Sequence, residues 1–325
     1  MTEVVIFAPA PVLTVTVEDH PDGPDVHIHA GGQGVWQARM LLRMGIDVTM
    51  CCVLTGESGR MLRHLLGDEG IRVVAVEREG RGGAFVHDRR GGERDKIAET
   101  GGEPISRHDL DELYGLTLGA GLDADLVILS GPHTEDVLPP ETYRRLAADL
   151  HTAGKAVIVD LSGERLAASL AGGVTVVKVS DEELLESERI TANETDQIVT
   201  AMRAMRDEGA GIVIVTRAQL PLLMLAGDDV VEVTTPTMEV TDTAGAGDSL
   251  TAGFAASLAR GESPEHAITL GAAAGALNVT RHGLGTGDPD TIEKLRELVK
   301  VRTLGATEET ITVTPSELAS RVDEK

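Results

Sequence analysis

The dominant pattern in this chain is a repeated alternation of short apolar runs with segments of helical periodicity. The apolar runs have the length of strands and are bounded by turn residues, which is typical of buried strands. When helices of this spacing separate the strands, the strands pair in parallel through crossover connections. The sequence therefore predicts an α/β fold with a mostly parallel central sheet. The apolar runs lie at 4–7, 47–54, 70–76, 124–131, 156–160, 174–178, 212–216 and 230–233, and the helical patterns at 35–44, 56–66, 109–118, 141–153, 195–208, 263–277 and 290–299.

The alternation breaks between residues 77 and 102, where Arg, Gly, Asp and Glu dominate. Short strand-like pieces remain in this segment, and alternating residues indicate half-exposed strands nearer the N-terminus. We expect strands from about 12–30 and 80–98 to pair as a small β lid on a single domain spanning 1–305; a solvated loop is the alternative for the second segment. Residues 306–325 are polar and acidic, and we expect them to form a C-terminal tail.

Composition excludes some classes of function. The 29 Lys and Arg residues stand against 53 Asp and Glu residues, a net charge of −24 that repels nucleic acids and anionic membranes. No apolar run approaches membrane-spanning length, and the N-terminus lacks a signal-peptide pattern. The two cysteines, Cys51 and Cys52, are adjacent in an apolar run and fit reduced core residues. We expect a cytoplasmic protein whose partner is a small molecule.

One glycine-rich stretch, Thr241–Asp248, carries the strongest chemical signal. Small residues from Ala244 to Gly247 permit a tight turn, and small and apolar residues at helical spacing follow it. A turn that opens a helix directs backbone N–H groups and the positive end of the helix dipole at one point, which suits a phosphate. A carboxylate is unfavourable there for anion binding alone. We infer that Asp248 is a general base that takes a proton from an attacking hydroxyl.

Two separated motifs resemble those of the ribokinase-like (PfkB) carbohydrate kinases. That family has a Gly-Gly-x-Gly turn before a helix that ends in Gly, here Gly31–Gly34 through Gly45, and Asp-Thr-x-Gly-Ala-Gly-Asp, here Asp242–Asp248. The resemblance covers roughly residues 1–300. It implies a three-layer sandwich and ATP-dependent transfer of the γ-phosphoryl group to a sugar hydroxyl. In that scheme Asp248 is the catalytic base, and the N–H groups of Gly245, Ala246 and Gly247 form the anion hole.

The resemblance also implies a site for MgATP. Ser180 and Glu183 fall where the family has Asn-x-x-Glu, whose glutamate helps to hold hydrated Mg²⁺; a capping box explains the same two residues without a metal. The nucleotide is expected to contact Lys178, Ser180, Thr216 and Asn278. The segment Thr216–Pro221 lacks the glycines usual in the family after that strand, so base recognition departs from the pattern.

Within the family, the chain looks most like the 1-phosphofructokinase and tagatose-6-phosphate kinase branch, with a divergent substrate end. The branch has Asn-Pro-Ala-x-Asp and Gly-Gly-Lys-Gly-x-Asn; here Val12 replaces the aspartate, Gln33 the lysine and Trp36 the asparagine. The sugar is expected to contact Gly31, Gly32, Gln33 and Trp36, with Arg81 at its phosphate. Four other lid cations could supply phosphate contacts or form a solvated surface: Arg89, Arg90, Arg94 and Lys96.

The leading hypothesis is therefore an MgATP-dependent kinase of a sugar or sugar phosphate. Val12, Gln33 and Trp36 motivate an alternative, a non-catalytic binding or regulatory protein on the same fold. Stacking of a ring on Trp36 would instead suit a nucleoside kinase. If the lid strands pair across a two-fold axis, the protein is a homodimer.

Overall fold

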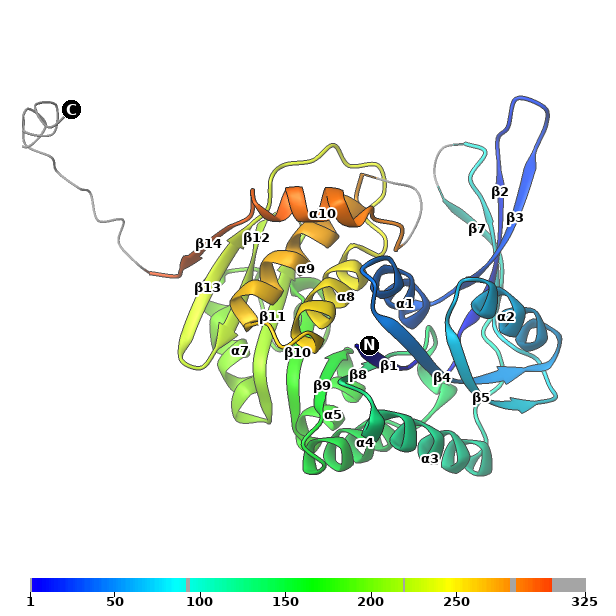
Figure 1. The fold of residues 1–325 in the computed structure, drawn as a ribbon, viewed down its shortest axis with the longest axis horizontal. Coiled ribbons are helices and arrows are strands. Elements are labelled where there is room, and N and C mark those ends of the chain that lie inside the picture. Colours follow the sequence, from blue (N-terminus) through cyan, green and yellow to red (C-terminus); the bar gives the residue numbers. More distant parts are fainter. Residues whose placement is uncertain (1, 92–93, 219, 281–284, 306–325) are drawn as a thin grey trace, which may run out of the picture.

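A ten-stranded sheet runs through the centre of the computed structural model, which describes residues 2–91, 94–218, 220–280 and 285–305 (Figure 1). Seven neighbouring strands are parallel, and three antiparallel strands extend one edge. The predicted mostly parallel sheet is thereby confirmed. In spatial order the strands are β5 (Arg72–Arg78), β4 (Asp47–Thr55), β1 (Glu3–Phe7), β8 (Leu126–Ser130), β9 (Ala156–Asp160), β10 (Val174–Ser180), β11 (Ala210–Arg217), β12 (Leu220–Ala226), β13 (Asp229–Thr234) and β14 (Lys300–Thr303).

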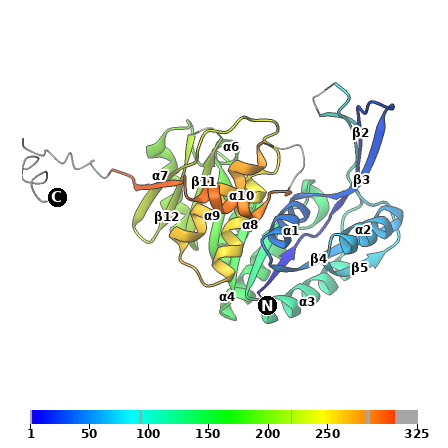
Figure 2. The same cartoon turned by 45° about the horizontal axis from the view of Figure 1, so that its top comes forward.

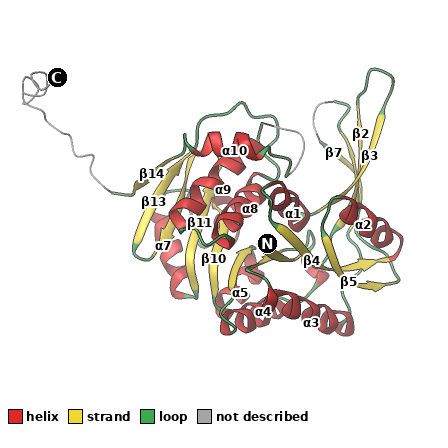
Figure 3. Cartoon of the chain, in the orientation of Figure 1, coloured by secondary structure: helices red, strands yellow, loops and turns green. Residues whose placement is uncertain are grey.

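Helices cover both faces of this sheet, because successive strand residues point to opposite sides (Figure 3). In β1, Val4 and Ile6 join one buried cluster while Val5 and Phe7 join the other. The predicted three-layer α/β arrangement is confirmed. The first cluster lies under α1 (Gln33–Arg43), α2 (Gly56–Asp68), α8 (Ala246–Ala259), α9 (Pro264–Asn278) and α10 (Pro289–Arg296), and the second under α3 (Arg107–Asp123), α4 (Glu141–Thr152), α5 (Gly163–Gly172), α6 (Asp181–Glu186) and α7 (Thr195–Asp207).

A separate four-stranded sheet projects from the body beside α2, as Figure 2 shows. Its order is β3 (Asp25–Gly31), β2 (Val12–Glu18), β6 (Ala84–Asp88) and β7 (Asp95–Thr100), so the segments expected near 12–30 and 80–98 do pair. One face of this small sheet is buried and carries Thr14, Thr16 and His87. The opposite face exposes Val26 and Ile28.

The sequence analysis did not predict helix α5 or strands β12 and β14. Strand β12 contains Pro221, a residue that has no N–H group for a ladder hydrogen bond. Pro221 has no partner in the ladder with β11, which shifts register between Val215 and Arg217 at this point. Its missing N–H group therefore costs no ladder hydrogen bond.

Other expectations fall partly beyond the described ranges. The predicted acidic tail at 306–325 lies outside them. None of the helices within the described ranges combines the length and apolar character that a membrane crossing requires.

Candidate active site

The glycine-rich turn leads directly into α8, as the sequence predicts. Gly245 adopts a left-handed conformation (φ 73°) and precedes the first helical residue, Ala246. This conformation is open to glycine at little cost, and it turns the chain so that Asp248 lies in the first helical turn. Asp248 is buried, with 8% of its surface exposed. The turn therefore places a buried carboxylate at the N-terminus of helix α8.

Asn278, at the end of α9, fixes this turn through hydrogen bonds. Its Nδ2 donates to the carbonyl of Ala244 (2.7 Å), and its Oδ1 accepts from the hydroxyl of Ser249 (3.1 Å) and from the amide of Gly285 (3.2 Å). Asn278 was predicted to contact the nucleotide. The structure places it against the protein's own backbone, where it fixes the shape of the turn.

The backbone amides of the turn differ in their availability. The amide of Ala246 donates to the carbonyl of Thr243 at 3.3 Å. The amides of Gly245 and Gly247 have no hydrogen-bond partner among the described residues. Two of the three amides predicted for the anion hole are thus free to bind an anion, and the third is weakly engaged.

Three polar residues lie in one row at the carboxyl ends of neighbouring parallel strands. Ser130 of β8 pairs in register with Asp160 of β9, which pairs with Lys178 of β10. Ligands of open α/β sheets bind at these strand ends. Lys178 was predicted, but Asp160 was not singled out, although an aspartate at the end of an apolar strand was a visible signal.

Asp160 is the hub of a buried polar network. Its Oδ1 accepts from the Lys178 ammonium (3.1 Å), and its Oδ2 accepts from the hydroxyl of Thr251 (2.9 Å) and the amide of Gln37 (3.2 Å). The same Gln37 amide donates to Oδ1 of Asp248 (3.3 Å). Strand ends and helices α1 and α8 therefore converge on two carboxylates and one ammonium.

Lys178 lies directly under the glycine-rich turn. A Cβ atom built on Gly247 would stand 2.7 Å from the Lys178 Nζ, so a larger residue at this position would displace the ammonium. Burial alone lowers the pKa of Lys178, but the carboxylates of Asp160, Glu183 and Asp248 outweigh it and hold that pKa above its usual value. Lys178 is consequently a permanent positive charge beside the turn.

For Asp248, in contrast, the effects that favour the neutral form outweigh those that favour the charged form. Burial and the neighbouring Asp160 carboxylate raise its pKa, while Lys178 and the Gln37 hydrogen bond lower it; Glu183 raises it slightly further. The net result is a pKa of about 8 in the absence of ligands. A carboxyl group tuned towards neutral pH is a common mark of an acid–base residue.

Ser180 and Glu183 form the capping box at the start of α6. Oε2 of Glu183 accepts from the amide (2.7 Å) and the hydroxyl (3.0 Å) of Ser180, whose hydroxyl accepts from the Glu183 amide (3.1 Å). Oε1 of Glu183 has no hydrogen-bond partner within the described ranges. Thr216 pairs in register with Ser180 on the adjacent strand. Within those ranges no cluster of three or more His, Cys, Asp or Glu side chains is placed to hold a metal ion.

The residues predicted to contact the sugar lie where strand β3 of the small sheet leads into helix α1. Gly32 packs beside Pro11 and Val12, and Gln33 accepts a hydrogen bond from the amide of Gly131 at the end of β8 (2.8 Å). The backbone of Trp36, one turn further along α1, packs closely against Gly285. Gln33 is thereby fixed next to the strand ends, on the same helix as Gln37, and Gly31 and Gly32 directly precede that helix.

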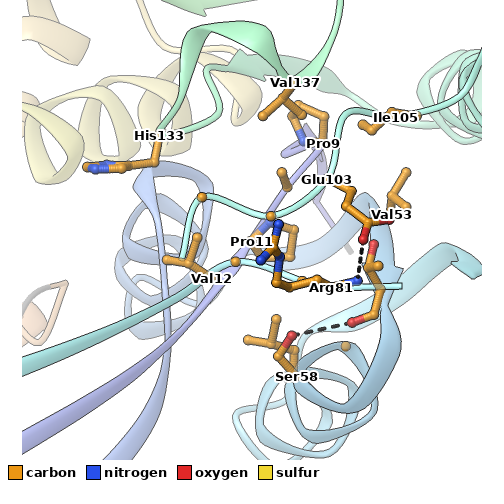
Figure 4. Close-up of a pocket in the computed structure, with 18 of the residues that line it drawn as sticks. Pro9, Pro11, Val12, Val53, Ser58, Arg81, Glu103, Ile105, His133 and Val137 are labelled. Atoms are coloured by element: carbon orange, nitrogen blue, oxygen red, sulfur yellow. Dashed lines mark hydrogen bonds between the residues drawn. The ribbon is translucent and has the colours of Figure 1, made fainter. Parts of the chain in front are cut away.

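Arg81 lies in the wall of a small cavity beneath the small sheet, and Pro11 and Val12, which pack beside Gly32, line the same cavity (Figure 4). The cavity measures about 30 Å³ and is also lined by Glu103 and His133. A water molecule needs about 10–15 Å³ by this measure, so the cavity as it stands has room for a few waters. The Arg81 backbone pairs with Glu103 in both directions.

The buried face of the small sheet is joined to the glycine-rich segment. Arg89, after β6, forms an ion pair with Asp242 (2.5 Å), and the Asp242 carboxylate also accepts from the amide of Ala244 (2.9 Å). On the same face, the ring of Phe85 meets His133 from the loop after β8, with ring centroids 4.6 Å apart. The small sheet thus lies over the carboxyl ends of the large one.

Cations gather on this face. Register places His29 beside Thr14, with Phe85 on the other side, and His87 beside Thr16. Burial and then nearby cations, Arg94 among them, lower the pKa of His29 to about 4 and lower that of His87. Nδ1 of His87 is buried and has no hydrogen-bond partner, and Arg94 has no ion pair or hydrogen bond within the described ranges. Arg94 therefore adds a positive charge to this face, and Asp242 interacts with that charge without forming an ion pair.

The other lid cations have partners. Arg90 pairs with Asp88 at the tip of the hairpin, and Lys96 pairs with Glu99 on β7. Among the described lid cations, neither Arg94 nor the Arg81 guanidinium has an ion pair or hydrogen bond, and Arg94 is the one of the two whose charge acts on His29 and His87.

Comparison with known proteins agrees with this geometry. The family model described as "pfkB family carbohydrate kinase" matches residues 2–291. A 1-phosphofructokinase of Bacillus subtilis is 26% identical over 85% of this chain and 89% of its own length. An ATP-dependent 6-phosphofructokinase isozyme 2 of Mycobacterium tuberculosis is 29% identical over 82% of this chain and 79% of its own. The crystal structure of phosphofructokinase-2 from Escherichia coli superposes with a TM-score of 0.82 at 24% identity, covering 91% of this chain and 99% of that one.

Proposed function

This chain belongs to the pfkB family of carbohydrate kinases and is an ATP-dependent sugar kinase, and on that basis we propose that Asp248 is the general base of the transfer. Asp248 takes the proton of the acceptor hydroxyl as its oxygen attacks the γ-phosphorus of ATP. The bond from that phosphorus to the bridging oxygen breaks, and ADP leaves. The observation that carries this assignment is a buried carboxylate in the first turn of a helix whose glycine-rich start offers free amides.

The cationic and amide groups around Asp248 have a separate task. The amides of Gly245 and Gly247 and the dipole of α8 stabilise negative charge on the transferring phosphoryl group. Lys178 adds a fixed positive charge under the same turn, and Asp160 keeps that ammonium in place.

The residues present fit a magnesium ion held mainly by nucleotide phosphates. Mg²⁺ retains most of its waters and needs few protein carboxylates. Asp160 has both oxygens engaged, whereas Glu183 keeps Oε1 free, so Glu183 would hold the hydrated ion. When bound with ATP, the ion supplies charge neutralisation on the phosphates. The nucleotide would lie along Lys178, Ser180 and Thr216.

The substitution Asp248→Asn tests the base directly. General-base catalysis contributes roughly 10²–10⁴-fold, so we expect kcat to fall by about that factor. The KM for ATP should change little, since the turn and Lys178 remain. Turnover is measured as ADP release with MgATP and fructose 1-phosphate, fructose 6-phosphate or tagatose 6-phosphate. Asp229→Asn, at the exposed start of β13, is the control. Unchanged turnover in a folded Asp248→Asn protein would refute the assignment.

We further propose that the substrate carries a phosphate group, bound on the buried face of the small sheet. Arg94 supplies the charge, and the neutral rings of His29 and His87 can each donate one hydrogen bond. Gln33 replaces the lysine expected at the sugar, so the anion needs a cation from another element. The relatives named phosphofructokinases support a sugar phosphate over a free sugar.

The substitution Arg94→Gln tests the proposed phosphate site without altering the proposed base, Asp248. We expect the KM for the sugar phosphate to rise at least about tenfold, the equivalent of one charge-assisted hydrogen bond, with kcat nearly unchanged. Arg90→Gln, on the same hairpin but paired with Asp88, is the matched control. If both variants give wild-type KM values, the phosphate is bound elsewhere.

We also propose a homodimer formed through the small sheet, whose outer face exposes Val26 and Ile28. Exposed apolar side chains of this kind, on one face of a sheet, suit an interface between two copies. A cytoplasmic location fits the use of ATP and the two free buried thiols, Cys51 and Cys52.

A further inference from the structure

Gln37 lies at the centre of the buried network, although neither the glycine motifs nor the family resemblance singles it out. Its side chain is fully buried, on the inner face of α1. The Nε2 atom is 3.2 Å from Oδ2 of Asp160 and 3.3 Å from Oδ1 of Asp248. A primary amide has two N–H protons, so both carboxylates can be bonded at once. Gln37 is the side chain that links the two carboxylates directly.

The orientation of the Gln37 amide is fixed from its other end. Oε1 accepts from the hydroxyl of Ser130 at 2.5 Å. The carbonyl of Ser130 in turn accepts from the hydroxyl of Tyr143 (3.0 Å), a fully buried residue of α4. A reversed amide would place its oxygen against two carboxylates and its N–H group against a hydroxyl, so only one orientation is satisfied.

Without a donor between them, Asp160 and Asp248 would be two buried carboxylates that share one small space. Such pairs do not both ionise readily, because like charges in a low dielectric repel strongly. Lys178 neutralises one of them, and it bonds to Asp160. Asp248 therefore depends on Gln37 for its hydrogen bond from the protein interior.

We propose that Gln37 is a positioning residue of the kinase reaction, whose amide holds Asp248 apart from Asp160 and aims its free oxygen at the acceptor hydroxyl. The proposal rests on the proposed role of Asp248 and adds a residue to it. Asp248 Oδ1 is engaged by Gln37, which leaves Oδ2 as the oxygen that receives the proton.

The expected signature is a change in the pH dependence of turnover. The groups that face Asp248 are Asp160 from β9, Lys178 from β10, Glu183 from α6 and Gln37 from α1. Of these, Gln37 and Lys178 favour the ionised carboxylate, whereas burial and the two acidic neighbours oppose it. Removing the Gln37 amide therefore raises the pKa of Asp248, and the base forms only at higher pH.

The test compares Gln37→Met with the wild type, since methionine conserves most of the volume and donates nothing. With MgATP and fructose 1-phosphate, the rising limb of the kcat profile should move towards higher pH by about one unit. At pH 7 kcat should fall about tenfold, while the KM for ATP should stay within about twofold. A ligand-free check is the titration of the Asp248 carboxyl carbon by NMR with labelled aspartate, assigned by its loss in Asp248→Asn. The pKa that this titration gives for Asp248 should also be higher in Gln37→Met than in the wild type.

Ser130→Ala is the second variant, and it keeps the proposal testable if Gln37→Met does not fold. It removes the hydroxyl that orients the amide, so a smaller shift in the same direction is expected. An unshifted profile and an unshifted carbon titration in a folded Gln37→Met or Ser130→Ala protein would overturn the role of Gln37 while leaving Asp248 as base. Full activity of Asp248→Asn would overturn the base itself, and the role of Gln37 with it.

Discussion

At the scale of single residues, the site depends on the charges and hydrogen bonds of five buried polar side chains. Asp160 and Lys178 form an ion pair that has additional hydrogen bonds from Thr251 and Gln37. A buried pair is tolerated when its remaining hydrogen-bonding capacity is satisfied in this way. Asp248 lies beside the pair, and the hydrogen bond that its side chain accepts among the described residues comes from Gln37. Burial and the neighbouring Asp160 carboxylate therefore raise the pKa of Asp248.

The raised pKa of Asp248 predicts a dependence of stability on pH. The folded protein binds this proton up to about pH 8, whereas an unfolded aspartate releases it near pH 4. Between these values the folded state holds more protons, so this group makes the protein less stable as the pH rises. Asp248→Asn removes the effect. Its advantage in unfolding free energy over the wild type should be absent near pH 4 and grow by at most about 1.4 kcal/mol per pH unit.

Urea unfolding of both proteins at several pH values between 4 and 8 measures this advantage. Asp229→Asn, at an exposed position, should follow the wild type throughout. Parallel curves for Asp248→Asn and the wild type would show that Asp248 titrates normally.

At the scale of elements, helix α8 is placed by its close contact with α9. A Cβ atom on Gly253 would stand 2.9 Å from the Cα of Gly271, and one on Gly271 would stand 2.7 Å from the carbonyl of Leu250. The two backbones therefore approach as closely as glycine permits. Because α9 also carries Asn278, which bonds to Ala244, this contact sets where the glycine-rich turn and Asp248 lie.

Gly253→Ala tests that contact. The added methyl group forces the helices apart, and we expect a loss of about 1–3 kcal/mol in unfolding free energy together with a lower kcat. The control is Gly67→Ala in α2, where a Cβ atom meets nothing within 4 Å. That change should raise stability by roughly 0.5–1 kcal/mol through helix propensity, with turnover unchanged. If Gly253→Ala and Gly67→Ala had equal effects on stability and turnover, the close contact between α8 and α9 would not be important for either.

At the scale of the whole molecule, the small sheet has two faces with different surroundings. Its polar face lies over the active site and is held by the ion pair between Arg89 and Asp242. Its other face exposes Val26 and Ile28, with 56% and 47% of their surfaces accessible. A single sheet that contacts substrate on one side and a second copy on the other would couple assembly to the geometry of the site.

Ile28→Glu is expected to dissociate the proposed dimer, because it buries a charge in an apolar interface. Light scattering after size-exclusion chromatography should show a dimer for the wild type and a monomer for the variant. Leu122→Glu on α3, which alters a comparably exposed leucine far along the chain, should remain dimeric. A monomeric wild type would rule out the proposed dimer at the concentrations used.

The sequence by itself determined the α/β class and the position of the glycine-rich turn. Both are local properties: apolar runs with helices between them predict a parallel sheet, and Gly245 before a helix marks an amide-lined turn. The matching motifs then gave the family, which the comparison confirms over residues 2–291. The capping box of Ser180 and Glu183 could also be inferred, because its partners are three residues apart.

Only the tertiary structure decided which distant residues surround the predicted base. Gln37 is 123 positions from Asp160 and 211 from Asp248, and no periodicity relates positions so far apart. The same holds for Arg94, whose availability depends on which acidic side chains the fold has already paired with Arg89, Arg90 and Lys96. Local pattern sets the elements, whereas the charge balance of a buried site depends on how those elements pack.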